Sequence, residues 1–209
     1  MKKLLIWALI VFGLIGATWG MAQLASSPGN QTTTFATEIS DSDWVKGDKD
    51  ASVVLIEYSD LQCPACAAYA PLVNQILGEF GDRIAFVYRH FPLPSHKNAE
   101  PAALAAEAAG KQGKFWEMVE LIFTNQTAWA EQADARETFT AYAQQLELDL
   151  NRFQTDRDSN TLRDRIRADY AGAIAVVNYT PTFFLNGIKI QNPRSYDEFR
   201  ELILQELSR

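Results

Sequence analysis

Residues 57–73, EYSDLQCPACAAYAPLV, hold the only two cysteines of this 209-residue chain. Cys63 and Cys66 are three positions apart, and Pro64 directly follows the first of them. Proline is favoured at the first position of a helix, because the N–H that it lacks would have no partner there. The stretch therefore predicts a helix that begins at Pro64, with Cys63 just before it and Cys66 one turn inside.

This placement is suited to thiol–disulfide exchange. Residues three apart at a helix start lie close enough for their sulfur atoms to bridge. Cys63 would face the unpaired N–H groups of the helix start, which stabilise a thiolate and lower the pKa of the thiol. Cys66 would be more shielded. We therefore expect Cys63 to be the nucleophile and Cys66 to resolve the mixed disulfide.

Two other interpretations of the cysteine pair stay open. A structural zinc site needs four ligands, and a predicted helix and strand separate His90 and His96 from the cysteines. We expect both histidines to lie in loops. A structural disulfide would close a very short loop, and the stabilisation from loop closure grows with loop length. The redox interpretation explains more of the local sequence than either alternative.

The segments around the cysteine helix predict a β-α-β unit. Residues 51–58 (ASVVLIEY) and 83–91 (RIAFVYRHF) are short apolar runs, typical of buried strands. Pro71 lies inside the predicted helix and should kink it. One strand before the helix and one after it indicate parallel pairing.

The rest of the chain predicts helices and then a hairpin. Between residues 95 and 176 the pattern indicates only helices, four in number, at 98–123 (two helices divided near Gly110), 133–148 and 159–176. TPTFFLNGIKIQ, at 180–191, predicts two short strands that turn at Asn186-Gly187, and an amphipathic helix follows at 195–207.

These motifs together resemble the DsbA-like thiol–disulfide oxidoreductases of the thioredoxin superfamily. CPAC at 63–66 follows the family's C-P-x-C pattern, Pro71 matches the proline of the active-site helix, and YTPTFFLNG at 179–187 resembles the family's T-P-T stretch. The resemblance covers about residues 48–209. It implies an α/β chain with a thioredoxin fold and an inserted all-α helical domain.

The resemblance also assigns roles to residues outside the cysteine pair. Pro181 would be the cis-proline beside the disulfide, and the backbone of Thr180 would pair with a bound substrate strand. Glu57 matches a buried acid that aids proton transfer near the resolving cysteine. The alternative is that Glu57 lies in solvent at a strand end or pairs with a basic side chain. Two departures are Tyr179, where the family often has glycine, and Ala65, where the strongest oxidants have histidine.

The N-terminal region predicts export from the cytoplasm. Lys2 and Lys3 precede a long apolar run without charge, and a segment rich in Ser, Thr, Pro and Gly follows it. We favour an uncleaved membrane anchor over a cleaved signal peptide. The predicted parts are a signal or anchor, a flexible linker, the first half of the thioredoxin fold, the helical insertion and the second half, at 1–22, 23–42, 43–94, 95–176 and 177–209.

Charge and motif together define the predicted function. The chain has 19 basic and 26 acidic residues, a formal net charge of −7, and no basic cluster that would suit nucleic acid. We expect an extracytoplasmic dithiol oxidase that acts on exported, cysteine-containing proteins without a metal or organic cofactor. The resemblance implies re-oxidation by a membrane quinone-linked protein. The alternatives are a reductase or isomerase of the same fold, or a metal-handling protein that uses the dithiol as ligands.

Overall fold

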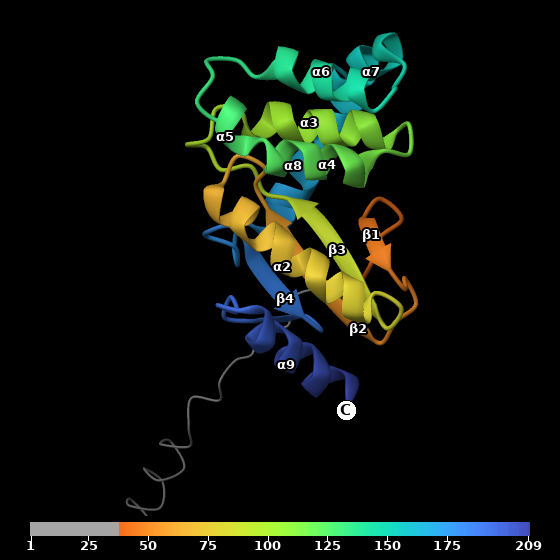
Figure 1. The fold of residues 1–209 in the computed structure, drawn as a ribbon, viewed down its shortest axis with the longest axis vertical. Helices are drawn as coiled ribbons and strands as arrows, with labels where there is room; N and C mark the ends of the chain where they lie inside the picture. The colour runs from red at the N-terminus through yellow and green to blue at the C-terminus, as the bar shows by residue number, and fades with distance from the viewer. Residues whose placement is uncertain (1–37) are drawn as a thin grey trace, which may run out of the picture. The chain divides into compact units, whose positions relative to one another are not determined.

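The computed structural model describes residues 38–209, in which five strands and eight helices form a mixed α/β fold (Figure 1). The strands are β1 (Trp44–Gly47), β2 (Val53–Ser59), β3 (Ile84–His90), β4 (Thr182–Leu185) and β5 (Ile188–Lys189). The helices are α2 (Pro64–Phe80), α3 (Ala99–Gly110), α4 (Phe115–Thr124), α5 (Gln126–Trp129), α6 (Arg136–Gln145), α7 (Leu150–Arg157), α8 (Asn160–Ala173) and α9 (Tyr196–Leu207).

The five strands form one sheet in the order β1-β3-β2-β4-β5. The β2 and β3 strands are parallel and are joined through α2, whereas β1 and β4 pair antiparallel with their neighbours. The hairpin from β4 to β5 turns at Asn186 and Gly187, both with positive φ, as the sequence predicts. Because β2 lies between β3 and β4, both of its edges are hydrogen-bonded to neighbouring strands and neither is open to solvent.

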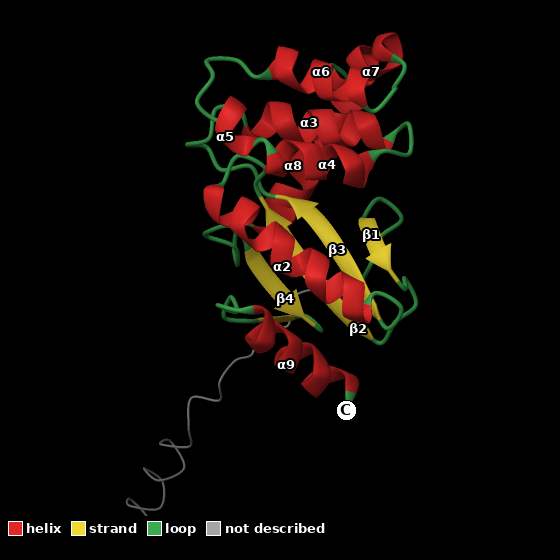
Figure 2. Ribbon diagram, in the orientation of Figure 1, coloured by secondary structure: helices red, strands yellow, loops and turns green. Residues whose placement is uncertain are grey.

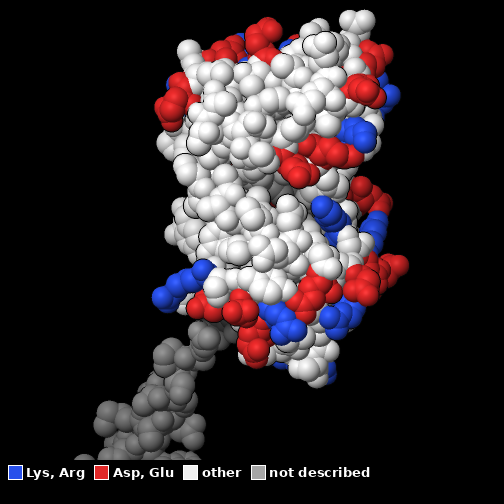
Figure 3. Space-filling model, viewed as in Figure 1, with Lys and Arg blue, Asp and Glu red and all other residues white. Residues whose placement is uncertain are grey.

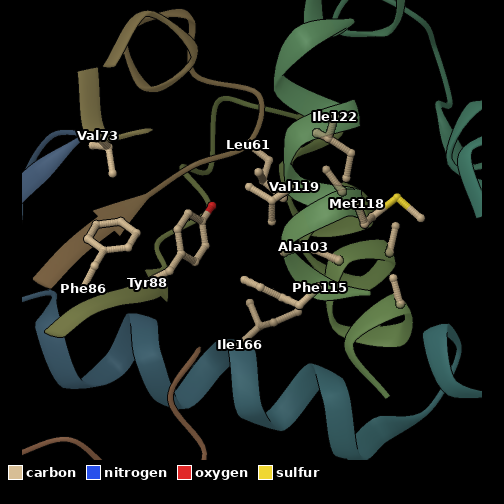
Figure 4. Close-up of a cluster of buried hydrophobic side chains, with 14 of the residues drawn as sticks. Leu61, Val73, Phe86, Tyr88, Ala103, Phe115, Met118, Val119, Ile122 and Ile166 are labelled. Atoms are coloured by element: carbon tan, nitrogen blue, oxygen red, sulfur yellow. The ribbon is translucent and has the colours of Figure 1, made fainter. Parts of the chain in front are cut away.

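Successive side chains along each strand point to opposite faces of the sheet, and both faces are apolar. Leu55 of β2 and Phe86 of β3 point to the face that α2 covers, whereas Ile56 and Val87 point to the opposite face. The face under α2 is continuous with the core of the helical segment. Figure 4 shows this cluster, in which Phe86 and Tyr88 of β3 meet side chains of α4 and α8, namely Phe115, Met118, Val119, Ile122 and Ile166.

Helix α2 begins and continues as its sequence predicts. Pro64 occupies the first turn, Cys63 is the N-cap, and Pro71 lies inside the helix. Its buried positions are spaced at helical intervals and face the sheet, at Cys66, Val73, Ile76 and Phe80. Figure 2 shows this helix running along the strands, with its first turn towards the helical segment.

Helices α3 to α8 lie between β3 and β4 in the chain, and α3 forms their centre. Nine of its twelve residues are buried, and seven of those nine are alanines. Such small side chains allow neighbouring helices to approach closely. Trp44 of β1 stacks on Phe115 of α4, with ring centroids 4.2 Å apart, and so joins the sheet edge to these helices.

The structure corrects three expectations from the sequence. Residues 95–176 form six helices rather than four, because α5 and α7 are too short to give a clear periodic pattern. The short strand β1 is an additional element that the apolar pattern does not reveal. His90 is the last residue of β3, where it pairs with Ser59, so it belongs to the strand predicted at 83–91 and the expectation that it lies in a loop is wrong. His96 does lie in a loop.

The predicted domain boundaries near residues 94 and 176 fall in the loops before α3 and after α8, and they stay predictions. The predicted anchor at 1–22, and most of the linker at 23–42, lie outside the described residues. Within 38–209, no helix is both long enough and apolar enough to cross a membrane.

Candidate active site

The two cysteines lie at the first turn of α2 as free thiols. Cys63 is 7% exposed and Cys66 is fully buried. Pro64 and Ala65, between them, are exposed. Cys66 is therefore the more shielded of the two cysteines, as the sequence predicts.

The environment of Cys63 favours its thiolate. A hydrogen bond from the thiol of Cys66 lowers the pKa of Cys63 to about 5, and the backbone N–H groups of Ala65 and Cys66 act in the same direction against the effect of burial. These N–H groups belong to the start of α2, where no preceding turn can pair them. In its protonated form, the Cys63 thiol donates to Thr180 O at 3.4 Å.

The environment of Cys66 has the opposite effect. Burial raises the pKa of Cys66 well above its ordinary value, and the nearby Glu57 carboxylate adds to the rise. The backbone N–H of Asp60 donates to Cys66 Sγ at 3.4 Å. The surroundings thus favour the thiolate form of Cys63 and the thiol form of Cys66.

Asp60 fixes the turn that leads into α2. Its carboxylate accepts hydrogen bonds from the N–H of Gln62 at 2.7 Å and of Leu93 at 2.8 Å. His96 Nδ1 lies 2.7 Å from Asp60 Oδ2. No motif in the sequence indicates this role for Asp60, and His96 serves here as a partner of its carboxylate.

Glu57 lies on β2 under α2 and is only 4% exposed. Burial raises its pKa to about 7, and the charge of Cys63 contributes in the same direction. The structure therefore contradicts the alternative that Glu57 faces solvent. Among residues 38–209, it also forms no ion pair with a basic side chain. Its role in proton transfer stays a prediction.

A cleft of about 310 Å³ reaches Glu57 from the surface between α2 and α4. Tyr88 lies beside Glu57 in the cleft wall, and Lys46 and Glu120 are the other charged residues that line it. The remaining lining is mostly apolar and includes Pro71. The buried carboxyl of Glu57 thus belongs to the lining of a cleft that opens to the surface.

The Thr180–Pro181 peptide bond is cis, as expected from the resemblance. Asn192 Nδ2 donates to Pro181 O at 2.7 Å and so holds this loop from the segment before α9. Tyr179, which stands where the family often has glycine, is 43% exposed, and Lys189 Nζ lies 4.8 Å from its ring centre. The Tyr179 ring therefore forms part of the accessible surface at the loop that carries Pro181.

The two histidines do not join the cysteines in a metal site. His90 Nε2 lies 3.1 Å from Glu107 Oε1, and Glu107 also accepts from Trp44 Nε1 at 2.7 Å. Within 38–209, no group of three or more His, Cys, Asp or Glu side chains is arranged to hold a metal ion. His90 therefore belongs to a buried polar contact between β3 and α3.

The surface around the cysteine pair is largely uncharged. Glu79, near the C-terminal end of α2, is the only charged residue of that helix. Figure 3 shows a broad area without charged side chains over the N-terminal part of α2 and the adjoining helical segment.

Three amide side chains complete the surroundings of the pair. Gln62, Asn98 and Gln126 are buried and bond mainly to backbone groups. Sequence reasoning missed all three. Asn and Gln are common on surfaces, and these residues come together only through the packing of the helical segment on the active-site turn.

Comparison with known proteins identifies the fold family. A family model described as "Thioredoxin" matches residues 40–205. Among solved structures, BdbD from Bacillus subtilis is 25% identical, with a TM-score of 0.70 and coverage of 79% of this chain and 92% of that one. The alpha-DsbA1 of Wolbachia pipientis, at 21% identity, has the same fold, with a TM-score of 0.74 and coverage of 81% and 93%.

The curated relatives carry a different name. Na⁺/H⁺ antiporter NhaA of Herminiimonas arsenicoxydans is 38% identical over 168 residues, which are 80% of this chain and 26% of that protein. NhaA 1 of Salinispora arenicola is 42% identical over 150 residues, 70% of this chain and 22% of that protein. The chain thus spans about a quarter of the length of these relatives, and the antiporter name describes the longer proteins.

The predicted resemblance is therefore confirmed by the family match, by the shared fold and by the presence of the cysteine pair at the start of α2. The chain belongs to the thioredoxin family, and it shares its fold with the solved structures of BdbD and alpha-DsbA1.

Proposed function

We propose that the protein is an extracytoplasmic dithiol oxidase that introduces disulfides into exported proteins through Cys63 and Cys66. The observation that carries this proposal is the asymmetry of the pair, in which the pKa of Cys63 is lowered to about 5 and that of Cys66 is raised. A stabilised thiolate favours the reduced pair over its disulfide. The disulfide is then a stronger oxidant of other thiols.

The reaction begins when a substrate thiolate attacks Cys63 Sγ of the oxidised pair. The Cys63–Cys66 bond breaks, and Cys66 leaves as a thiolate that takes a proton from Glu57. A second substrate thiolate then attacks the substrate sulfur of the mixed disulfide, and Cys63 leaves as its stabilised thiolate. The substrate dithiol loses two electrons and two protons. The cysteine pair gains the two electrons, one proton restores that given by Glu57 to Cys66, and the other passes to solvent because Cys63 remains a thiolate.

Thr180 and Pro181 are proposed to position the substrate in this reaction. Thr180 O is already within 3.4 Å of Cys63 Sγ, so an extended chain paired with the Thr180 backbone would bring its own sulfur beside Cys63. We also propose that a membrane quinone-linked protein takes the two electrons from the reduced pair. Its contact surface would include the uncharged area over the start of α2.

The proposed setting is the outer side of the membrane, with the N-terminal segment as an uncleaved anchor. Its support is the apolar run that follows Lys2 and Lys3. The full-length protein should stay with membranes through an alkaline, high-salt wash and retain its first residues. A mature form that is released in the wash and begins near Met21 or Gln23 would reject the anchor.

Trapping of mixed disulfides tests the assignment of the two cysteines. Cys66→Ala should accumulate mixed disulfides between Cys63 and exported proteins in cells, because Cys66 is absent and cannot release the substrate by the reverse of the first step. Cys63→Ala is the matched control and should trap none. Equal trapping by both variants would reject the assigned roles. A stoichiometric metal in protein purified under reducing conditions would favour the metal-handling alternative.

A further inference from the structure

Gln126 is the first residue of α5, and its side chain reaches the active-site turn. Its Nε2 donates to Leu61 O at 2.9 Å and to Cys63 O at 3.0 Å. The residue is 7% exposed, so solvent cannot readily replace these two hydrogen bonds. One amide group of the helical segment thus holds the backbone on both sides of Gln62.

The helix that carries Gln126 is itself firmly placed. Trp129, at the other end of α5, is fully buried and donates Nε1 to Ile122 O at 2.9 Å. Its ring also meets that of Phe139, with centroids 5.0 Å apart. Because α5 is anchored in the core of the helical segment, the amide of Gln126 has a defined position relative to the turn.

The carbonyl of Cys63 belongs to the residue whose sulfur reacts. That oxygen also accepts the N–H of Ala67 at 3.2 Å, in the first hydrogen bond of α2. Cys63 has an extended backbone conformation, with φ −71° and ψ 122°, and no side-chain cap stabilises it. A rotation of this residue would move Sγ away from the N–H groups of Ala65 and Cys66.

Gln62 provides a second attachment for the same turn. Its Oε1 accepts the N–H of Asn98 at 2.6 Å, and its Nε2 donates to Ala130 O at 2.7 Å. This pair of bonds fixes the middle of the turn, whereas Gln126 fixes the carbonyls on either side of it. Gln126 is the member of the network that contacts the backbone of Cys63 itself.

We propose that Gln126 is a positioning residue for the nucleophile, holding the backbone of Cys63 so that its sulfur faces the N–H groups of α2. The helical segment then helps to set the reactivity of the cysteine pair through this one amide. The inference rests on the proposed function only in that Cys63 is the attacking sulfur. It deepens that function by linking the insertion to the chemistry.

The test compares Gln126→Met with Gln112→Met. Methionine has a similar length but no N–H donor. Gln112 is the matched control, since its Nε2 also donates to a backbone carbonyl, Asp149 O at 3.1 Å, in a bond that joins the loop after α3 to the residue before α7. Thiolate absorbance against pH measures the pKa of Cys63. Equilibration with reduced and oxidised glutathione measures how readily the pair is reduced.

Gln126→Met should raise the pKa of Cys63 towards that of a free thiol, about 8.5. The equilibrium constant for reduction of the disulfide should fall about tenfold, which corresponds to about 30 mV. Gln112→Met should leave both values within about twofold of the unchanged protein. Gln126→Ala is the second variant and serves if Gln126→Met does not fold. Water can occupy the space left by the shorter side chain, so this variant should keep the fold.

If either Gln126 variant folds and keeps both the Cys63 pKa and the glutathione equilibrium, the inference is overturned. A fall in thermal stability without a redox change would overturn it equally, by making Gln126 a purely structural residue. These comparisons are made between variant and parent. A parent protein that proves to be a weak oxidant would therefore contradict the proposed function and leave the role of Gln126 to be judged by the variants.

Discussion

Glu57 of β2 and Tyr88 of β3 lie directly opposite each other in the parallel register, and both line the cleft between α2 and α4. Both are almost fully buried in the sheet under α2. The carboxyl, with a pKa raised by burial to about 7, can gain or lose a proton near neutral pH. It is thus suited to exchange protons with the buried thiol of Cys66 on one side and with the cleft on the other.

The first prediction concerns the kinetics of the mixed disulfide. In the reverse of the first step of the proposed reaction, Cys66 attacks the mixed disulfide as a thiolate and releases the substrate, and Glu57 acts as the base that accepts the Cys66 proton. The release rate should therefore rise with pH through about 7. Glu57→Gln should slow release by on the order of a hundredfold and remove that rise. Stopped-flow release of a model peptide is the measurement, and identical profiles for both proteins between about pH 5 and 8 would exclude the role.

The second prediction follows from the same carboxyl and concerns stability. Its folded pKa of about 7 lies above the ordinary value of 4.5, so the fold favours the protonated form. The contribution to stability is complete below about pH 4.5 and is lost as the pH rises to about 7. The shift corresponds to about 3 kcal/mol.

The Glu57→Gln variant should lack this pH-dependent contribution to the free energy of unfolding. Urea unfolding of both proteins at about pH 4 and about pH 8 would measure it, because the other titrating groups cancel between them. The parent should lose about 3 kcal/mol more than the variant over this interval. An equal loss in both would show that Glu57 has an ordinary pKa.

The third prediction uses two glycines with opposite surroundings. Gly47 has φ +98°, and a Cβ there would lie 2.4 Å from Ile84 O. Gly47→Ala should therefore destabilise the protein by about 2 kcal/mol or more. Gly78 lies inside α2, and a Cβ added there would meet no atom within 4 Å, so Gly78→Ala should stabilise by about 0.5–1 kcal/mol. Thermal unfolding of the two variants would check both signs, and a Gly47→Ala protein as stable as the parent would contradict the backbone conformation described for the end of β1.

The features that the sequence predicts well are those with a local cause. Pro64 after Cys63 indicates the helix start, and the Asn186-Gly187 pair indicates the hairpin, because each depends on the backbone preferences of adjacent residues. The cis bond before Pro181 was expected from a family motif of similar length. Such signals need no knowledge of the tertiary packing.

The features that the sequence does not predict depend on distant contacts. Gln126 is 63 positions from Cys63, and nothing in its neighbours distinguishes it from a surface glutamine. His90 becomes buried in a polar contact because Glu107, which also bonds Trp44, meets it from another element. The helix α5 has only four residues, too few for a periodic pattern, yet it places Gln126 at the active-site turn.

The reduction potential of the Cys63–Cys66 disulfide tests the central claim most directly. Equilibration with glutathione buffers, with thiolate absorbance recorded on the same sample, would give the potential and the pKa of Cys63 together. We expect a potential above that of thioredoxin, about −270 mV, and below that of DsbA, about −120 mV, because the side chain of Ala65 supplies no additional donor to the thiolate. The pKa of Cys63 should lie near 5. A potential at or below about −270 mV, with Cys63 titrating near 8.5, would contradict the oxidase assignment and favour a reductase.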